Sequence, residues 1–85
     1  MAMYSNTYEE AHANWAKVDT LIENWTDEQV GALHDALNDY EMGGIELTKK
    51  QAYGRLYRIA KRLGVTVMAL CDYHCGVCCH FKAEA

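Results

Sequence analysis

TKKQAYGRLYRIAKRLGVTVMALC, residues 48–71, is the stretch of sequence that decides the fold. It opens on Thr48, places Gln51 three residues later, and then repeats apolar residues at every third or fourth position. The threonine–glutamine spacing is that of a capping box, in which two side chains satisfy free backbone N–H groups at the start of a helix. Gly64 then ends the helix, and Thr66 is placed to start another. The stretch therefore predicts two consecutive helices joined by a tight turn.

The same start signal occurs twice more, earlier in the chain. Thr7 precedes Glu10, and Thr26 precedes Gln29, by the same three-residue spacing, and apolar residues at helical spacing follow each threonine. Because the chain contains no proline, these signals predict an all-α fold, a small bundle of about four helices in a single domain over residues 1–85. The expected helices are 7–25, 27–42, 49–63, and one that begins near residue 66 and continues at least to residue 73.

The predicted domain has three parts. Residues 7–42 form an acidic helical hairpin, and residues 48–74 form a basic and then apolar hairpin with a helix-turn-helix-like arrangement. Residues 71–80 are a C-terminal segment rich in cysteine and histidine. The glycines at positions 43 and 44 are the expected joint between the two hairpins.

Charge is distributed unevenly along this chain, whose net charge is −4. Carboxylates predominate before residue 48, whereas residues 48–62 carry lysine and arginine but no acid. This asymmetry predicts two electrostatically distinct faces, each able to attract a different partner. The acidic face, expected to bind a basic nucleic-acid-binding groove on a partner, consists of Glu9, Glu10, Asp19, Glu23, Asp27, Glu28, Asp35 and Asp39. The basic face, expected in the alternative to contact nucleic acid, consists of Lys49, Lys50, Arg55, Arg58 and Arg62.

Cysteine and histidine crowd into residues 71–80, CDYHCGVCCH. Thiolate and imidazole are preferred zinc ligands, and the gap between Cys75 and Cys78 is that of a zinc knuckle. One structural zinc there would draw on Cys71, Cys75, Cys78 and His80, with His74 and Cys79 as substitutes and His12 or His34 as distant additions. Since an unbroken helix spreads Cys71 and Cys78 over ~10 Å, this site requires the helix to stop before Cys75, with Gly76 permitting the turn. The alternative is an unbroken helix whose cysteines continue a buried stripe.

Residues 56–70, LYRIAKRLGVTVMAL, resemble helix-turn-helix domains of the lambda-repressor-like type. Ala60, Gly64, Val65 and Leu70 match the small, turn and core positions of that motif. The resemblance implies a DNA-binding regulator in which the second helix reads base edges and the basic helix before it contacts phosphates. This sequence departs from the motif where bases would be read, because the second helix offers mainly apolar or acidic side chains. The same sequence also resembles the structural closing helices of that family, which need not touch DNA.

No catalytic arrangement is evident in the sequence. His12 and His34 stand singly on predicted helices with no nearby serine or cysteine to activate, so we expect no enzymatic activity. The N-terminal residues lack a positive region followed by an apolar run, and no uncharged stretch approaches the ~18–20 residues that span a bilayer. We therefore expect a cytoplasmic protein with no membrane partner.

Together these features predict a small non-enzymatic binding protein that modulates or inhibits a larger partner, a protein or nucleoprotein complex, through its charged helical faces. In character the chain resembles small accessory proteins of bacteriophages or mobile elements that act against host or defence machinery. Two alternatives stay open, a helix-turn-helix regulator and a zinc-stabilised interaction module. The apolar seam of the first helix, which includes Trp15 and Trp25, predicts either core packing or a homodimer surface.

Overall fold

A threonine precedes each α-helix in the computed structural model, and its hydroxyl accepts a hydrogen bond from the backbone N–H three residues later. At Thr26 and Thr48 a glutamine side chain accepts from the threonine N–H in return, which completes the capping box. The elements that follow these caps are α1 (Tyr8–Leu21), α2 (Asp27–Met42), α3 (Lys49–Leu63), α4 (Val67–Cys71) and the π-helical segment η1 (Asp72–His80).

The structure describes residues 3–43 and 47–81, apart from the side chain of Cys78. Helices are the only regular elements within these ranges, so the predicted all-α fold is confirmed. Both α2 and α3 have the predicted bounds. The first helix is shorter than the expected 7–25, because Ile22 leaves the helical conformation and the chain turns toward the next threonine cap.

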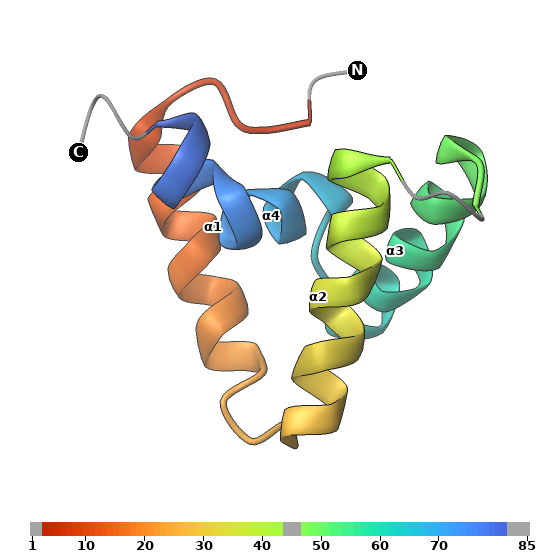
Figure 1. The fold of residues 1–85 in the computed structure, drawn as a ribbon. Coiled ribbons are helices and arrows are strands. Elements are labelled where there is room, and N and C mark those ends of the chain that lie inside the picture. The colour runs from red at the N-terminus through yellow and green to blue at the C-terminus, as the bar shows by residue number, and fades with distance from the viewer. Residues whose placement is uncertain (1–2, 44–46, 82–85) are drawn as a thin grey trace.

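The segments α4 and η1 form one continuous helical rod that runs between α1 and the pair formed by α2 and α3 (Figure 1). On one side α1 packs against α4 and η1, and on the other side α2 and α3 pack against each other and against α4. The helices α1 and α2 meet at their connecting turn and then diverge. The predicted acidic segment 7–42 is therefore a splayed pair of helices with the C-terminal rod between its arms.

Every α-helix contributes fully buried apolar side chains to one core. These are Val18 from α1, Leu33 and Leu37 from α2, Leu56 from α3 and Leu70 from α4. Removing each of these large side chains from water contributes roughly 1.5–3 kcal/mol. The short α4 is buried over most of its circumference because it has neighbours on both sides, which explains why its sequence is almost entirely apolar.

The seam of α1 is only partly covered by this core. Val18 and Ile22 are buried, and Trp25 packs against the core cluster. Trp15 remains 38% exposed, with its ring stacked on that of His12 at a centroid distance of 5.7 Å. The homodimer surface therefore stays a prediction, centred on Trp15.

The C-terminal helix does not stop before Cys75, as the predicted zinc knuckle requires, but continues to His80. Its turns are wider than those of an α-helix, and the Phe81 N–H donates to the Gly76 carbonyl five residues earlier at 2.9 Å. Gly76 makes no turn. It is buried inside η1, where a Cβ would lie only 2.9 Å from Asp72 Oδ1. The glycine is therefore explained by the close approach of the Asp72 carboxylate.

That carboxylate ties the N-terminal segment to the rod. The Asp72 side chain is fully buried, and its Oδ1 accepts a hydrogen bond from the Ser5 N–H at 3.0 Å. Its Oδ2 accepts from the Ser5 hydroxyl at 2.6 Å and from Asn14 Nδ2 at 2.8 Å. Three donors compensate for the loss of water around a buried carboxylate. We call this group, Asp72 with Ser5 and Asn14, the Asp72 latch.

Replacing Asp72 with alanine leaves the donors of Ser5 and Asn14 without their acceptor. We expect Asp72→Ala to lower the free energy of unfolding by about 2–4 kcal/mol, measured by urea titration with circular dichroism. The matched control is Asp35→Ala on the exposed side of α2, which should change it by less than about 0.5 kcal/mol. Equal losses in the two variants would contradict the latch.

Candidate functional site

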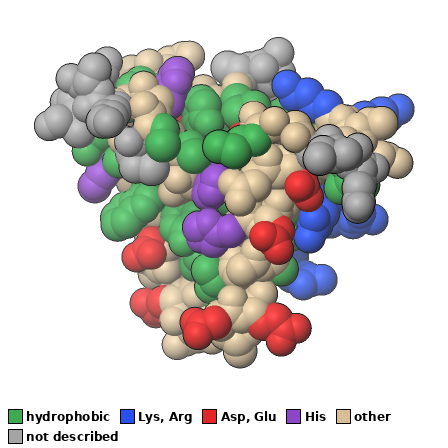
Figure 2. All heavy atoms as spheres, viewed as in Figure 1, with side chains coloured by type: hydrophobic (Ala, Val, Ile, Leu, Met, Phe, Trp, Pro, Cys, Tyr) green, Lys and Arg blue, Asp and Glu red, His purple; other side chains and the backbone are tan. Residues whose placement is uncertain are grey.

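Apart from Lys17 on α1, the lysines and arginines that the structure describes lie on α3, on a different side of the molecule from most of the carboxylates. In Figure 2 the carboxylates are spread along α1 and α2 down to their converging ends, and the lysines and arginines gather over α3. Within the described residues, one ion pair joins the two faces, between Arg55 Nη1 and Asp39 Oδ2 at 3.1 Å. The other residues of the predicted acidic face are exposed, namely Glu9, Glu10, Asp19, Glu23, Asp27, Glu28 and Asp35.

The predicted basic face follows α3. Lys49, Lys50, Arg58 and Arg62 are exposed, whereas Arg55 is half-buried by its pairing. Because α3 carries no acid of its own, its positive charge is not neutralised within the helix.

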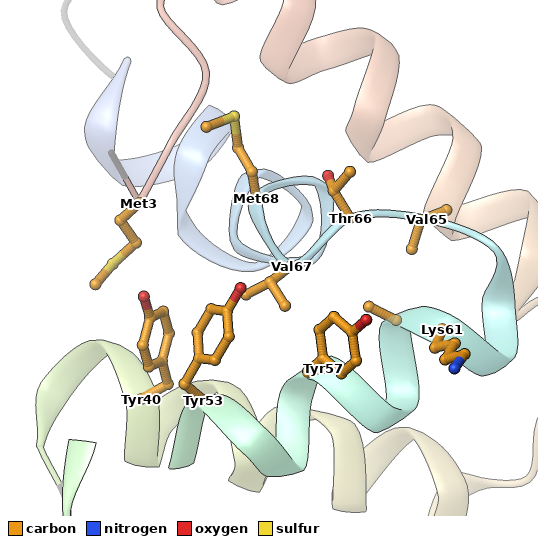
Figure 3. A pocket seen from close by; sticks show the side chains of 10 residues that line it. Met3, Tyr40, Tyr53, Tyr57, Lys61, Val65, Thr66, Val67 and Met68 are labelled. Carbon is orange, nitrogen blue, oxygen red and sulfur yellow. The ribbon is translucent and has the colours of Figure 1, made fainter. Parts of the chain in front are cut away.

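A pocket of about 470 Å³ opens beside this basic helix, between α2, α3 and the start of α4 (Figure 3). Tyr40, Tyr53 and Tyr57 stand in a row along it, with centroid distances of 5.7 and 6.3 Å between successive rings. Met3 and Val67 face these rings. The volume is typical of sites that hold small molecules or single side chains of a partner.

Two positive groups border the tyrosine pocket. Lys61 lines it, and Lys49 Nζ lies 5.7 Å from the centroid of the Tyr40 ring. Sequence reasoning missed the pocket because its tyrosines come from two helices. The available signal was the four-residue spacing of Tyr53 and Tyr57, which places both on one face of α3.

The helices α3 and α4 form a tight hairpin. Gly64 adopts the left-handed conformation with φ 76°, and the Val65 N–H donates to the Ala60 carbonyl at 3.0 Å, as in a Schellman motif. However, α4 is enclosed, with Val67 and Leu70 buried. A helix in this position has few side chains left to present to a major groove. The exposed charges of α3 are better placed for contacts with phosphates.

A second cluster lies where the C-terminal end of α2 meets the rod. The side chain of Glu41 is only 4% exposed, and its Oε2 lies 2.6 Å from His74 Nδ1. The Cys75 Sγ lies 3.3 Å from the same nitrogen. Ligand atoms of Glu41, His74 and Cys75 all lie within 4.8 Å of one another. We call these three residues the Glu41 cluster.

The structure only partly assembles the zinc ligands expected from the sequence. Cys75 belongs to the Glu41 cluster. The Cys71 thiol lies close to Glu41, and burial together with the Glu41 carboxylate raises its pKa. His80 instead stacks on Tyr4, with ring centroids 4.7 Å apart. The side chain of Cys78 lies outside the described part of the structure.

Of the other expected ligands, some lie at the Glu41 cluster and others lie away from it. His74 belongs to the cluster, and the centroid of the His34 ring, on α2, lies 5.2 Å from the centroid of the His74 ring. His12 lies elsewhere, against Tyr8 and Trp15 on α1. In Figure 2 some histidine side chains lie together near the middle of the face, and others lie apart from them.

The arrangement does not fit nucleophilic catalysis by cysteine. Burial, followed by the Glu41 carboxylate and the Cys79 thiol, raises the pKa of Cys75 to about 12, whereas a reactive cysteine needs a lowered pKa. In addition, Nδ1 of His74 faces both the thiol and the carboxylate. A catalytic base would use one ring nitrogen for the thiol and the other for the orienting carboxylate.

Comparisons of the chain with protein-family models, with curated proteins and with solved structures found no match. Among the helices that the structure describes, none combines the length and the apolar character needed to cross a bilayer.

The raised pKa of Cys75 predicts slow alkylation in the folded chain. At pH 8 its thiolate fraction is roughly one in ten thousand, and the rate should keep rising about tenfold for each pH unit well above pH 9. In the urea-unfolded chain the same residue should level off near pH 9, because an ordinary thiol has a pKa of about 8.5. Mass spectrometry after timed iodoacetamide treatment, in chelator and reductant, resolves each cysteine. A plateau near pH 9 in the folded chain would contradict this prediction.

Proposed function

We propose that this chain is a non-enzymatic binding domain that modulates a larger macromolecular partner through its charged helical faces. The observation that supports this function is the separation of exposed carboxylates on α1 and α2 from exposed lysine and arginine on α3 (Figure 2). Charges that are not neutralised within the molecule steer partners of opposite charge. The raised pKa of Cys75 and the shared nitrogen of His74 favour binding over catalysis.

The α3 side is the better candidate for the principal contact, because charge and aromatic rings occur there together. Proteins that bind single-stranded nucleic acid combine a basic groove for the phosphates with aromatic rings on which bases stack. Tyr57 is 51% exposed at the edge of the tyrosine pocket, and Lys61 lines the same pocket. The exposed Arg58 and Arg62 belong to the same helix. We therefore propose single-stranded nucleic acid, free or in a nucleoprotein complex, as the partner of this side.

The enclosed position of α4 favours a single strand over a duplex. A helix-turn-helix protein reads duplex DNA with side chains near the start of its second helix. Here Val67 is buried and Met68 is half-buried. Phosphate contacts by α3 and stacking on Tyr57 require nothing from α4.

This proposal predicts a salt-dependent affinity for a short single-stranded oligonucleotide. If about four phosphates are engaged, affinity should fall about 50-fold between 50 and 200 mM salt, and Arg58→Ala with Arg62→Ala should reduce the log–log slope by about 1.4. Tyr57→Ala should weaken binding by about 1–3 kcal/mol with little change in the slope. The matched control, Lys17→Ala on α1, should bind like the parent chain. Fluorescence anisotropy measures all four proteins, and the absence of binding at 50 mM salt would reject the proposal.

The acidic face supports a second candidate function, inhibition of a partner by occupying its basic nucleic-acid-binding groove. This is the mode of action we propose if the chain is an accessory protein of a bacteriophage or mobile element. The supporting observation is that Asp19 on α1, Glu23 in the connecting turn and Asp35 on α2 are all exposed. Within the described residues none of the three forms an ion pair.

Charge reversal tests the acidic face. Asp19, Glu23 and Asp35 lie outside the first helical turns, so replacing all three with lysine should leave the helicity unchanged. The triple variant should bind an oligolysine peptide at least about tenfold more weakly than the parent chain. The opposite change, Lys17→Glu on α1, should strengthen binding. Isothermal titration calorimetry at low salt measures both effects, and an unchanged affinity in the triple variant would remove this candidate.

A further inference from the structure

The Glu41 cluster contains a buried carboxylate whose loss of hydration is only partly compensated by hydrogen bonds. The Glu41 side chain is 4% exposed, and its Oε1 accepts no hydrogen bond from the described residues. The last turn of α2 carries no basic residue, and the partial negative charge of a helix C-terminus adds to that of the carboxylate. The thiols of Cys71 and Cys75 are weak donors beside this carboxylate, so a cation would compensate its buried charge more fully.

The donor atoms around this carboxylate are suited to a divalent transition metal. His74 and Cys75 lie three and four residues after Cys71, so each lies about one turn from Cys71 along the rod. Imidazole nitrogen, thiolate sulfur and carboxylate oxygen are the zinc ligands of proteins. The cluster needs no break in the helix, because the third ligand, Glu41, comes from α2.

The distances between these atoms are close to those of a zinc site. Bond lengths of ~2.0–2.3 Å in a tetrahedral shell put neighbouring ligand atoms ~3.3–3.6 Å apart. The Cys75 Sγ and His74 Nδ1 already lie 3.3 Å apart. The His74 Nδ1 and Glu41 Oε2, at 2.6 Å, would need to separate by less than about 1 Å. Rotation of the side chains provides a movement of this size.

We propose that Glu41, His74 and Cys75 bind one zinc ion, with water or a neighbouring thiol as the fourth ligand. The ion replaces the proton of the Cys75 thiol and neutralises the Glu41 carboxylate. It cross-links the C-terminal end of α2 to η1, two elements that the sequence separates by some thirty residues. This site is independent of the proposed function, since neither charged face includes these residues.

Metal titration of the purified, reduced and chelator-stripped chain tests the site. Co²⁺ serves as a spectroscopic probe, because a thiolate ligand gives a charge-transfer band, and Zn²⁺ should displace it at one equivalent. Zinc should also raise the melting temperature, since it binds the folded chain in preference to the unfolded chain. Glu41→Gln, which keeps the shape of the side chain, and Cys75→Ser should each weaken binding at least about tenfold.

The matched control is His80→Gln, which removes a histidine of the same segment that stacks on Tyr4 outside the cluster. It should bind zinc like the parent chain. Binding that is lost in His80→Gln but kept in Glu41→Gln would overturn the proposal in favour of the ligand set predicted from the sequence. The absence of saturable binding at one equivalent would overturn it altogether. Circular dichroism of each variant distinguishes loss of the zinc site from loss of the fold. If Cys75→Ser does not fold, the zinc affinity of Glu41→Gln alone decides whether the proposal holds.

Discussion

The buried carboxylate of Asp72 is the interaction on which the arrangement of this molecule depends. By accepting hydrogen bonds from Ser5 and Asn14, it fixes the N-terminal segment and α1 against one side of the C-terminal rod. It thereby sets the rotation of the rod about its axis, and that rotation directs His74 toward α2. Gly76 follows from the same constraint, because a Cβ at that position would press on Asp72.

Two buried carboxylates lie at the rod, Asp72 within it and Glu41 on the neighbouring α2. Their surroundings differ. Asp72 is satisfied by backbone and side-chain donors within the fold, which is what a structural role requires. Glu41 meets an imidazole and thiols, and one of its oxygens is left without a donor among the described residues. This contrast separates a group that holds the fold together from a group that is arranged to receive a cation. A buried polar group that lacks a hydrogen-bond partner often marks a functional site or a position where an ion binds.

Local signals predicted the beginnings of the helices but not the contacts between them. Thr26 and Thr48 are identifiable from sequence because a capping box lies within four consecutive residues. The pairing of Glu41 with His74 joins residues 33 positions apart, and no spacing rule reaches that far. The π-helical widening of η1 was not predicted either, since π-helices are rare and no residue pattern in this segment marks one. The sequence therefore predicted an unusual cysteine and histidine segment, while the identity of its third partner depended on tertiary structure.

Hydrogen exchange of the Ser5 amide, followed by NMR, tests this central constraint most directly. Ser5 lies outside every helix, so its amide is protected only if it donates to Asp72 Oδ1 in the buried latch. We expect protection of the Ser5 amide comparable to that of amides in the middle of η1. Exchange at the rate of an unstructured peptide, while amides of α3 remain protected, would show that the N-terminal segment is not held against the rod and would contradict the account.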